Sequence, residues 1–210
     1  MTKYNNMHIA IAGNIGVGKT TLCKMLAKHY KWSPLFEAVD NNPYLDNFYE
    51  DMQRWSFNLQ VFFLNSRFRQ VQDIIKSKKT IIQDRTIYED AYIFAPNLQA
   101  MGLMTQRDYD NYLDLFQLME SFVSAPDLLI YLRSDVPSLV NRIQNRGRDY
   151  EEGIRIDYLK RLNERYEAFF ANYQHNHLII QANEIDFQNN NADLGVIIEK
   201  IDSNLSGLFK

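Results

Sequence analysis

Residues 13–20 read Gly-Asn-Ile-Gly-Val-Gly-Lys-Thr, a spacing that is typical of phosphate-binding loops. The apolar run at 8–12 before it favours a buried strand, and residues 21–28 after it favour a helix. Glycines allow successive backbone N–H groups to turn inward around a polyphosphate at the positive end of such a helix. The alternative is a glycine-rich turn that only opens a helix. We interpret the stretch as the strand, loop and helix that begin a P-loop NTPase fold.

The loop residues have distinct expected roles. Lys19 would reach the β- and γ-phosphates of a nucleotide, and the Thr20 hydroxyl would contact Mg²⁺. The residues that we expect to bind the phosphate donor here are Gly13, Asn14, Ile15, Gly16, Val17, Gly18, Lys19, Thr20 and Thr21. The sequence therefore predicts a site for a nucleotide polyphosphate with its magnesium ion.

Short apolar runs alternate with helical stretches along the chain. Strands are expected at 9–12, 34–36, 80–82, 128–132 and 178–180. Helices are expected at 21–28, 54–78, 88–99, 106–124, 138–145, 156–173 and 195–208. This alternation predicts an α/β fold with a five-stranded parallel sheet covered by helices on both faces. A length of 210 residues suits one domain spanning 1–210.

Charge and cysteine content exclude several kinds of protein. A net charge of −3 argues against binding a nucleic acid polymer, which usually requires a basic face. Cys23 is the only cysteine, so an internal disulfide is impossible and a reducing compartment is favoured. No apolar segment approaches the ~18 residues of a membrane span. We expect a cytoplasmic protein that binds a small nucleotide and has no membrane partner.

Charged residues follow two of the expected strands. Glu37 comes after the second strand, and Asp84 and Arg85 come after the third. In open parallel sheets, ligands bind beyond the carboxyl ends of the strands. Glu37 could accept a proton from an attacking hydroxyl, Asp84 could bind Mg²⁺, and Arg85 could hold Glu37 or a phosphate. The alternative is an ion pair at the mouth of a loop.

Two further groups of polar residues lie on expected helices. Arg142 and Arg146 share a helix face, and Arg148 follows Gly147, so the three could neutralise charge during phosphoryl transfer. The alternative is a solvated basic face. On the long helix, Gln60 and Arg67 point roughly the same way among aromatic residues. A glutamine there could read the edge of a planar base.

With these residues in view, the chain resembles the deoxyribonucleoside kinase family, most closely its bacterial purine kinases. The resemblance covers almost the whole chain. It rests on the phosphate loop, Glu37 with Asn-Pro-Tyr-Leu at 42–45, Arg-Trp-Ser-Phe at 54–57 with Gln60 and Arg67, Asp-Arg-Thr-Ile-Tyr-Glu-Asp at 84–90, and Arg-Gly-Arg at 146–148 with Glu151. Marks that occur in this order are more specific than the loop alone.

The resemblance implies transfer of the γ-phosphoryl group of MgATP to the 5′-hydroxyl of a deoxynucleoside. Glu37 would activate that hydroxyl with Arg85 beside it, and Asp84 would lie near the metal with Thr20. A closing lid at about 142–153 would contribute the remaining catalytic residues, Arg142, Arg146 and Arg148.

The same resemblance assigns the ligand contacts. Gln60 would read the base, Phe94 would stack on it, and Tyr49 with Glu151 would hold the sugar 3′-hydroxyl. Residues 183–187, including Asp186 and Phe187, are similar to the segment that contacts the donor adenine. Helices near 88–99 and 106–124 are expected to form a homodimer, although core packing would explain their apolar residues equally well.

Arg67 and Asp90 bear on which nucleoside is used. Thymidine-preferring members of the family have smaller or apolar residues at these positions. A charged pair leaves no room for a thymine methyl group, and Asp90 could accept a hydrogen bond from an amino group on adenine, guanine or cytosine. We expect deoxyadenosine as the acceptor, with deoxyguanosine or deoxycytidine as alternatives.

The sequence also departs from the family pattern. Ala38 replaces a proline that often follows the catalytic glutamate, and Asn42 stands roughly where animal members have a tryptophan. The sugar contacts near Asn42 are therefore left open. More distant alternatives are a nucleoside monophosphate kinase, whose dianionic acceptor Glu37 would repel, and a non-enzymatic ATP-binding switch.

Overall fold

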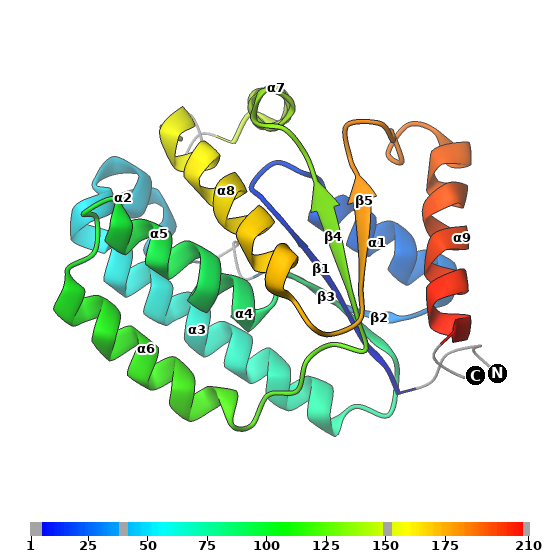
Figure 1. Cartoon of the computed structure of the whole chain (residues 1–210), viewed down its shortest axis with the longest axis horizontal. Coiled ribbons are helices and arrows are strands. Elements are labelled where there is room, and N and C mark those ends of the chain that lie inside the picture. Colours follow the sequence, from blue (N-terminus) through cyan, green and yellow to red (C-terminus); the bar gives the residue numbers. More distant parts are fainter. Residues whose placement is uncertain (1–5, 38–41, 149–152, 208–210) are drawn as a thin grey trace.

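The computed structural model describes residues 6–37, 42–148 and 153–207. Its central sheet has the strand order β2-β3-β1-β4-β5, and all neighbouring strands are parallel (Figure 1). The strands are β1 (His8–Gly13), β2 (Ser33–Leu35), β3 (Ile81–Asp84), β4 (Leu128–Arg133) and β5 (His177–Gln181). The prediction of a five-stranded parallel sheet is confirmed. Each observed strand overlaps an expected one.

The helices cover both faces of this sheet. The helices are α1 (Lys19–Tyr30), α2 (Leu45–Glu50), α3 (Met52–Lys76), α4 (Ile87–Glu89), α5 (Ala95–Ala100), α6 (Gln106–Glu120), α7 (Val136–Arg146), α8 (Ile156–Asn172) and α9 (Asn191–Gly207). In Figure 1, α1 and α9 lie on one side of the sheet, and α3 and α8 lie on the other. This arrangement confirms the expected α/β fold.

The alternation of side chains along β1 explains the two faces. Ile9 and Ile11 pack in a core with α1 and α9, whereas Ala10 and Ala12 pack in a second core with α3 and α8. Successive strand residues point to opposite faces, so a strand that is covered on both sides is apolar throughout. All four side chains are fully buried.

The strand register brings the predicted site residues to one edge of the sheet. Ile11 of β1 is aligned with Asp84 of β3, and Gly13 of β1 is aligned with Leu132 of β4. The phosphate loop therefore begins beside the segment that carries Asp84 and Arg85. This is the edge at which ligands bind in open parallel sheets.

The long helix α3 begins and ends close to its expected bounds. Asp51 caps its N-terminus, because its carboxylate accepts a hydrogen bond from the Arg54 N–H at 3.0 Å. Its buried side chains include Gln60 and Arg67, so both residues point inward among apolar neighbours. The helix thus directs two polar groups toward the strand ends.

Two features of the helical layer differ from expectation. The stretch 88–99 was predicted as one helix, but it contains a π-helical segment, η1 (Asp90–Phe94), between α4 and α5. Such segments are rare and frequently occur at functional sites. The short helix α2 was not predicted, and its Leu45 and Phe48 are buried. Both differences lie around the candidate site.

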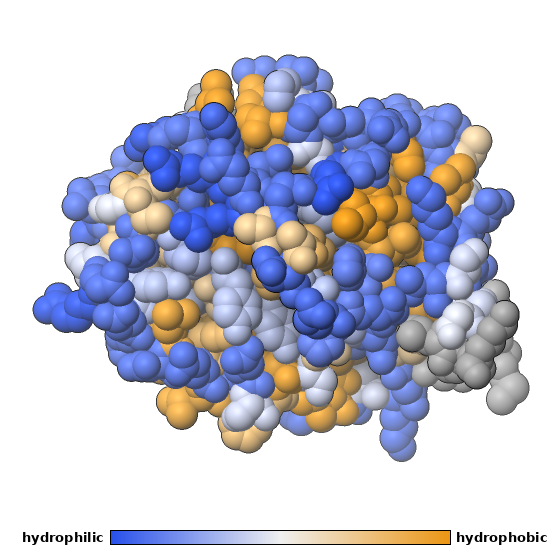
Figure 2. Space-filling view, in the orientation of Figure 1, coloured by the Kyte–Doolittle hydropathy of each residue, from blue (hydrophilic) through white to orange (hydrophobic). Residues whose placement is uncertain are grey.

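The outer surface is mostly hydrophilic. In Figure 2, one apolar area lies between β5 and α9, and smaller apolar groups lie along the lower edge of the view. The lower edge corresponds to α6 and the end of α3. Ile75 near the end of α3, Leu118 in α6 and Phe122 just after α6 are exposed. In the part of the chain that the structure describes, every helix is too short or too polar to cross a membrane.

Candidate active site

A cavity of about 440 Å³ opens beyond the carboxyl ends of β1 and β3. It brings together residues from the phosphate loop, the strand ends, α3, η1 and the segment after α7. The predicted site residues that line it are Ile15, Gly16, Gly18, Lys19, Thr20, Thr21, Glu37, Tyr49, Gln60, Asp84, Arg85, Phe94, Arg146 and Arg148. Groups that are far apart in the sequence therefore share one cavity.

The phosphate loop adopts a conformation that depends on glycine. Gly16 and Gly18 have φ angles of +84° and +104°, in the region that other residues rarely adopt. Lys19 folds back over the loop, where its Nζ donates to the Gly13 and Asn14 carbonyl oxygens at 2.8 and 3.0 Å. Burial, together with Arg85, lowers the pKa of Lys19 to about 8. A bound phosphate would replace these carbonyls as the hydrogen-bond acceptor of Lys19 Nζ, because phosphate oxygens carry more negative charge.

Thr20 and Asp84 form the candidate magnesium site. The Thr20 hydroxyl donates to Asp84 Oδ2 at 2.5 Å, whereas the buried Asp84 Oδ1 has no hydrogen-bond partner in the described chain. Oxygen ligands suit Mg²⁺, which usually binds one or two protein groups together with substrate phosphates and water. The described residues contain no cluster of three or more acidic, histidine or cysteine side chains that would form a complete protein cage. The residues fit a magnesium ion that is bound with a nucleotide.

Glu37 lies between two arginines at the cavity wall. Its Oε1 is 2.9 Å from Arg85 Nη1 and 3.1 Å from Arg67 Nη2. Burial acts to raise the pKa of Glu37, but Arg85, Arg67 and Lys19 outweigh burial and hold this pKa below its ordinary value. Glu37 is therefore ionised at neutral pH, and 14% of its side chain remains exposed. An ionised carboxylate at this position can accept a proton.

Arg67 connects Glu37 to Asp90. Its Nε lies 3.4 Å from Asp90 Oδ2, and both side chains are almost completely buried. The expected pairing of Arg67 with Asp90 is confirmed, whereas the additional contact with Glu37 was not predicted. Burial raises the pKa of Asp90 to about 7 against the opposing effects of Arg67 and Arg85. Neither Arg67 nor Asp90 is among the described residues that line the cavity. They form its buried support.

The apolar half of the cavity contains the residues expected to hold a base. Phe94 lies below Arg85, whose Cζ is 4.2 Å from the centre of the ring. Gln60 is buried, and its Oε1 has no hydrogen-bond partner in the described chain. An unpaired amide oxygen in such a pocket can accept a hydrogen bond from a ligand.

Several residues of this pocket were missed from the sequence. Leu45 and Phe48 reach the cavity from α2, and Tyr158 reaches it from α8. The only sequence signal for α2 was the Asn-Pro-Tyr-Leu segment at 42–45, whose last residue begins this helix. Asn42 accepts a hydrogen bond from the Tyr44 N–H at 3.0 Å and is not among the described lining residues.

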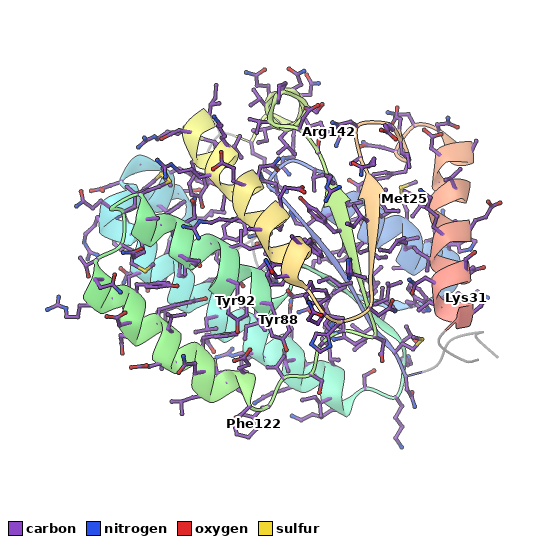
Figure 3. All side chains as sticks on the ribbon, in the orientation of Figure 1. Met25, Lys31, Tyr88, Tyr92, Phe122 and Arg142 are labelled. Carbon is purple, nitrogen blue, oxygen red and sulfur yellow. The ribbon has the colours of Figure 1, made fainter. Side chains whose placement is uncertain are left out.

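The predicted lid arginines divide into two groups. Arg146 and Arg148 line the cavity. Arg142 instead points from α7 toward the ends of β4 and β5 (Figure 3), where it donates to the Val17 carbonyl at 3.2 Å and the Ala182 carbonyl at 2.6 Å. Arg142 therefore links α7 to the phosphate loop. Residues 149–152 of the predicted lid, including Glu151, lie outside the described residues.

The other residues that are expected to bind the phosphate donor, including Phe187, Asp186 and Asn14, are not among the described residues that line the cavity. Phe187 is buried against the phosphate loop, because a Cβ atom added to Gly18 would lie 3.0 Å from its ring. Asp186 is exposed and accepts hydrogen bonds from Asn189. Asn14 joins the loop to α8 by donating to the Leu159 carbonyl at 3.0 Å.

Comparisons with known proteins agree with this geometry. A family model described as deoxynucleoside kinase matches residues 9–206. The chain is 38% identical over 201 residues to the deoxyadenosine/deoxycytidine kinase of Bacillus subtilis (strain 168), which covers 94% of this chain and 93% of that protein. It is 42% identical over 180 residues to the deoxyadenosine kinase of Dictyostelium discoideum, covering 86% of this chain and 73% of that protein.

Solved structures give a similar result. The deoxyadenosine kinase from M. mycoides, with the products dCMP and a flexible dCDP bound, matches with a TM-score of 0.85 and 31% identity. The match covers 94% of this chain and 100% of that chain. Other relatives are named as deoxyguanosine kinases, so the names of the matched proteins do not agree on one base.

Proposed function

The chain belongs to the deoxynucleoside kinase family, and we propose that it transfers the γ-phosphoryl group of ATP to the 5′-hydroxyl of deoxyadenosine. The products are then deoxyadenosine monophosphate and ADP. The main support is the position of Glu37, which lies in the same cavity as the phosphate loop and is held ionised by Arg85 and Arg67. A general base at this position shares one cavity with the loop that would bind the phosphate donor, so a nucleoside bound there would lie between them.

In the proposed reaction, Glu37 accepts the proton of the 5′-hydroxyl as that oxygen attacks the γ-phosphorus. General base catalysis of this kind typically contributes ~10²- to 10⁴-fold to the rate. Arg85 keeps the carboxylate in place, and its contact with Phe94 ties it to the wall of the nucleoside pocket. The rest of the catalytic effect comes from positioning and charge neutralisation.

Charge on the phosphates is met from three directions. The loop N–H groups and Lys19 would hold the β- and γ-phosphates, and Arg146 at the end of α7 and Arg148 just after it line the same cavity. We assign to Arg142 the role of fixing α7 to the phosphate loop, because both of its terminal nitrogens donate to backbone carbonyls, one of them in that loop. Mg²⁺, bound by Thr20 and Asp84, would neutralise further charge on the donor phosphates.

The preference for deoxyadenosine rests on the polar groups around the nucleobase pocket. Gln60 lines the pocket, and its Oε1 has no hydrogen-bond partner in the described chain. The ion pair of Arg67 and Asp90 supports this lining. Acceptors select bases that carry an amino group, as adenine does. Guanine and cytosine also carry one, so deoxyguanosine and deoxycytidine are the alternative acceptors.

The remaining ligand contacts follow from the same assignment. Tyr49 lines the cavity and would hold the sugar 3′-hydroxyl together with Glu151. Asp186 and Phe187 would lie beside the donor adenine, since Phe187 packs against Gly18 of the phosphate loop.

We also propose that the protein is a homodimer. Within the stretch 106–124, which is expected to contribute to the interface, Tyr112 belongs to the core, whereas Phe122 is 66% exposed. Tyr92 is 44% exposed and stacks with Tyr88 and Phe169; Figure 3 shows Tyr88 and Tyr92 side by side. Exposed aromatic side chains of this kind are enriched at protein interfaces. Sedimentation velocity should give twice the mass of one chain, and a monomer at micromolar concentration would contradict the proposal.

The acceptor can be tested by comparing deoxyadenosine with its monophosphate. We expect ADP to form with deoxyadenosine and not with deoxyadenosine monophosphate, because Glu37 would repel a dianion. Product chromatography should show a monophosphate that accumulates without conversion to the diphosphate. Faster turnover of the monophosphate would favour a nucleoside monophosphate kinase. No ADP formation with any nucleoside would favour a nucleotide-binding switch.

A further inference from the structure

A buried carboxylate outside the proposed reaction lies between the two halves of the site. Glu89 is the last residue of α4 and is completely buried. It lies at the junction of α4, the start of the phosphate loop and α8; α4 and α8 lie on the same side of the sheet, and the loop begins at the end of β1 (Figure 1). The steps assigned to Glu37, Asp84 and the arginines do not use it.

Both oxygens of Glu89 accept hydrogen bonds. Oε2 accepts from the Thr86 N–H at 2.8 Å and from the Thr86 hydroxyl at 3.3 Å. Oε1 accepts from the Tyr166 hydroxyl at 2.8 Å and from the Gly13 N–H at 3.2 Å. The two N–H groups must donate and the two hydroxyls can donate, so the ionised carboxylate would accept all four hydrogen bonds. Burial raises the pKa of Glu89 above its ordinary value, against the opposing effects of Arg85, Lys19 and the hydrogen bonds from Thr86 and Tyr166. Hydrogen bonds to an ionised acceptor are stronger than those between neutral groups.

Only half of this arrangement is explained by the helix itself. Thr86 and Glu89 form a capping box at the start of α4, and a capping box needs only the contacts of Oε2. The contacts of Oε1 reach residues far away in the sequence and add nothing to the cap. A glutamine serves a capping box as well as a glutamate does.

The backbone of Gly13 is restrained at its N–H, at its carbonyl and at its Cα. Its N–H donates to Glu89, and its carbonyl accepts from Lys19 Nζ at 2.8 Å. A Cβ atom at this position would lie 2.8 Å from the Leu132 carbonyl oxygen, so the backbone is closely packed against β4. Thr86, at the other end of the Glu89 contacts, directly follows the Asp84 and Arg85 pair. The Glu89 carboxylate thus joins the first residue of the phosphate loop to the turn that carries Asp84 and Arg85. Asp84 belongs to the candidate magnesium site, and Arg85 contacts the proposed general base, Glu37.

We propose that Glu89 is a positioning residue that fixes the donor phosphate loop against the Asp84–Arg85 turn through the Gly13 N–H. The proposal rests on the proposed kinase reaction for its catalytic consequence but not for its effect on nucleotide binding. Lys19 and Arg85 lie close enough to interact electrostatically with the carboxylate, so its charge also acts on two groups of the site. A glutamine has one acceptor oxygen and one NH2 group, so the amide oxygen that keeps the Thr86 cap would leave the Gly13 N–H facing a donor.

The test compares Glu89→Gln with a matched control, Glu167→Gln. Glu167 also accepts from a tyrosine hydroxyl, that of Tyr131 at 2.8 Å, but it is about half-exposed and lies outside the site. Calorimetric titration with MgADP measures nucleotide binding without any turnover. We expect the Kd for MgADP to rise at least about tenfold in Glu89→Gln and to stay within about twofold in Glu167→Gln. An unchanged Kd in Glu89→Gln would reduce Glu89 to a helix cap and overturn the proposal.

Kinetics and spectroscopy separate positioning from stability. In Glu89→Gln, we expect a higher KM for MgATP and a lower kcat, with the KM for deoxyadenosine within about threefold of the wild type. If Glu89→Gln does not fold, Tyr166→Phe keeps the carboxylate and removes one donor. In that variant, the amide proton of Gly13 should shift in the nitrogen–proton correlation spectrum and exchange faster with solvent. Unchanged shift and exchange would overturn the proposal. A wild type that binds MgADP but phosphorylates nothing would instead contradict the kinase function.

Discussion

The donor and acceptor halves of the cavity are built in different ways. The donor half is a short continuous segment whose backbone and Lys19 satisfy one another, as the contacts with the Gly13 and Asn14 carbonyls show. The acceptor half draws Glu37, Arg67 and Asp90 from three separate segments and leaves buried polar atoms of Arg67 and Asp90 without hydrogen bonds in the described chain. These Arg67 and Asp90 atoms are ion-paired within the network, whereas Gln60 Oε1 in the cavity lining has no partner in the described chain and is an acceptor that a ligand can satisfy.

This difference assigns separate tasks to the two halves. A loop made of backbone groups recognises phosphates, which all nucleotide donors share. A buried network of charges depends on which base completes it, so selectivity belongs to the acceptor half.

The largest effect is expected from removing the general base, Glu37. Glu37→Gln should lower kcat by about 10²-fold or more, because general base catalysis typically contributes that much. The Kd for deoxyadenosine should change little, since Arg85 and Arg67 still have hydrogen-bond acceptors in the glutamine amide. Initial rates and equilibrium titration give the two values, with Glu167→Gln as the control. Near-normal turnover would remove Glu37 from the proposed role.

Selectivity should respond to Asp90. Asp90→Asn removes the charge opposite Arg67, and we expect kcat/KM for deoxyadenosine to fall about 10- to 100-fold relative to that for thymidine. Comparing two substrates on one variant cancels any loss of folded protein. An equal fall with every base would contradict the assignment of selectivity to the buried pair.

The two groups of lid arginines should differ in their kinetics. Arg146→Met removes a charge that faces the cavity, and we expect kcat to fall roughly tenfold or more, since arginines at this position stabilise the charge of phosphoryl transfer. Arg142→Met removes two hydrogen bonds to backbone carbonyls and should act mainly on the KM for MgATP. Steady-state rates at varied MgATP distinguish them. Equal losses of kcat in both variants would return Arg142 to the catalytic group.

The smallest effect concerns the pH dependence of stability. Burial raises the pKa of Asp90 to about 7, above the ordinary value of 3.8, so the folded state retains a proton that the unfolded state has lost. The stabilisation is therefore complete below the unfolded pKa and is lost as pH rises through 7. Arg67, Arg85, Glu37 and Glu89 all act on this carboxyl.

Denaturant unfolding of the wild type and Asp90→Asn at pH 5 to 8 measures this effect. The free energy of unfolding of the wild type should fall relative to that of the variant, on the order of 1 kcal/mol per pH unit, as pH rises toward 7. A difference that stays constant over this range would show that Asp90 is ionised throughout.

The two halves also differed in how far the sequence could predict them. The phosphate loop was predictable because its glycines, lysine and threonine lie within eight consecutive residues between a strand and a helix. The contact between Glu37 and Arg67 was not, because it depends on how α3 crosses the end of β2. The contacts of Glu89 with Gly13 and Tyr166 were hidden for the same reason. Long-range contacts between buried charges leave no local pattern.

Local structure around the acceptor was partly misread for physical reasons. Residues 88–99 have a helical pattern, but Pro96 within it has no N–H to donate to the carbonyl four residues before it. That proline indicated an irregularity, although not the π-helical form of the segment that places Asp90 and Phe94. The helix α2 has six residues, too few for periodicity to predict it, and its Leu45 and Phe48 are held by tertiary packing. Both features line or support the nucleoside pocket.

The central claim is that this site phosphorylates a deoxynucleoside selected by its amino-bearing base. Its most direct test is an initial-rate panel of deoxyadenosine, deoxyguanosine, deoxycytidine and thymidine at saturating MgATP. We predict that deoxyadenosine has the highest kcat/KM and thymidine the lowest. A kcat/KM for thymidine that equals or exceeds that for deoxyadenosine would contradict the account.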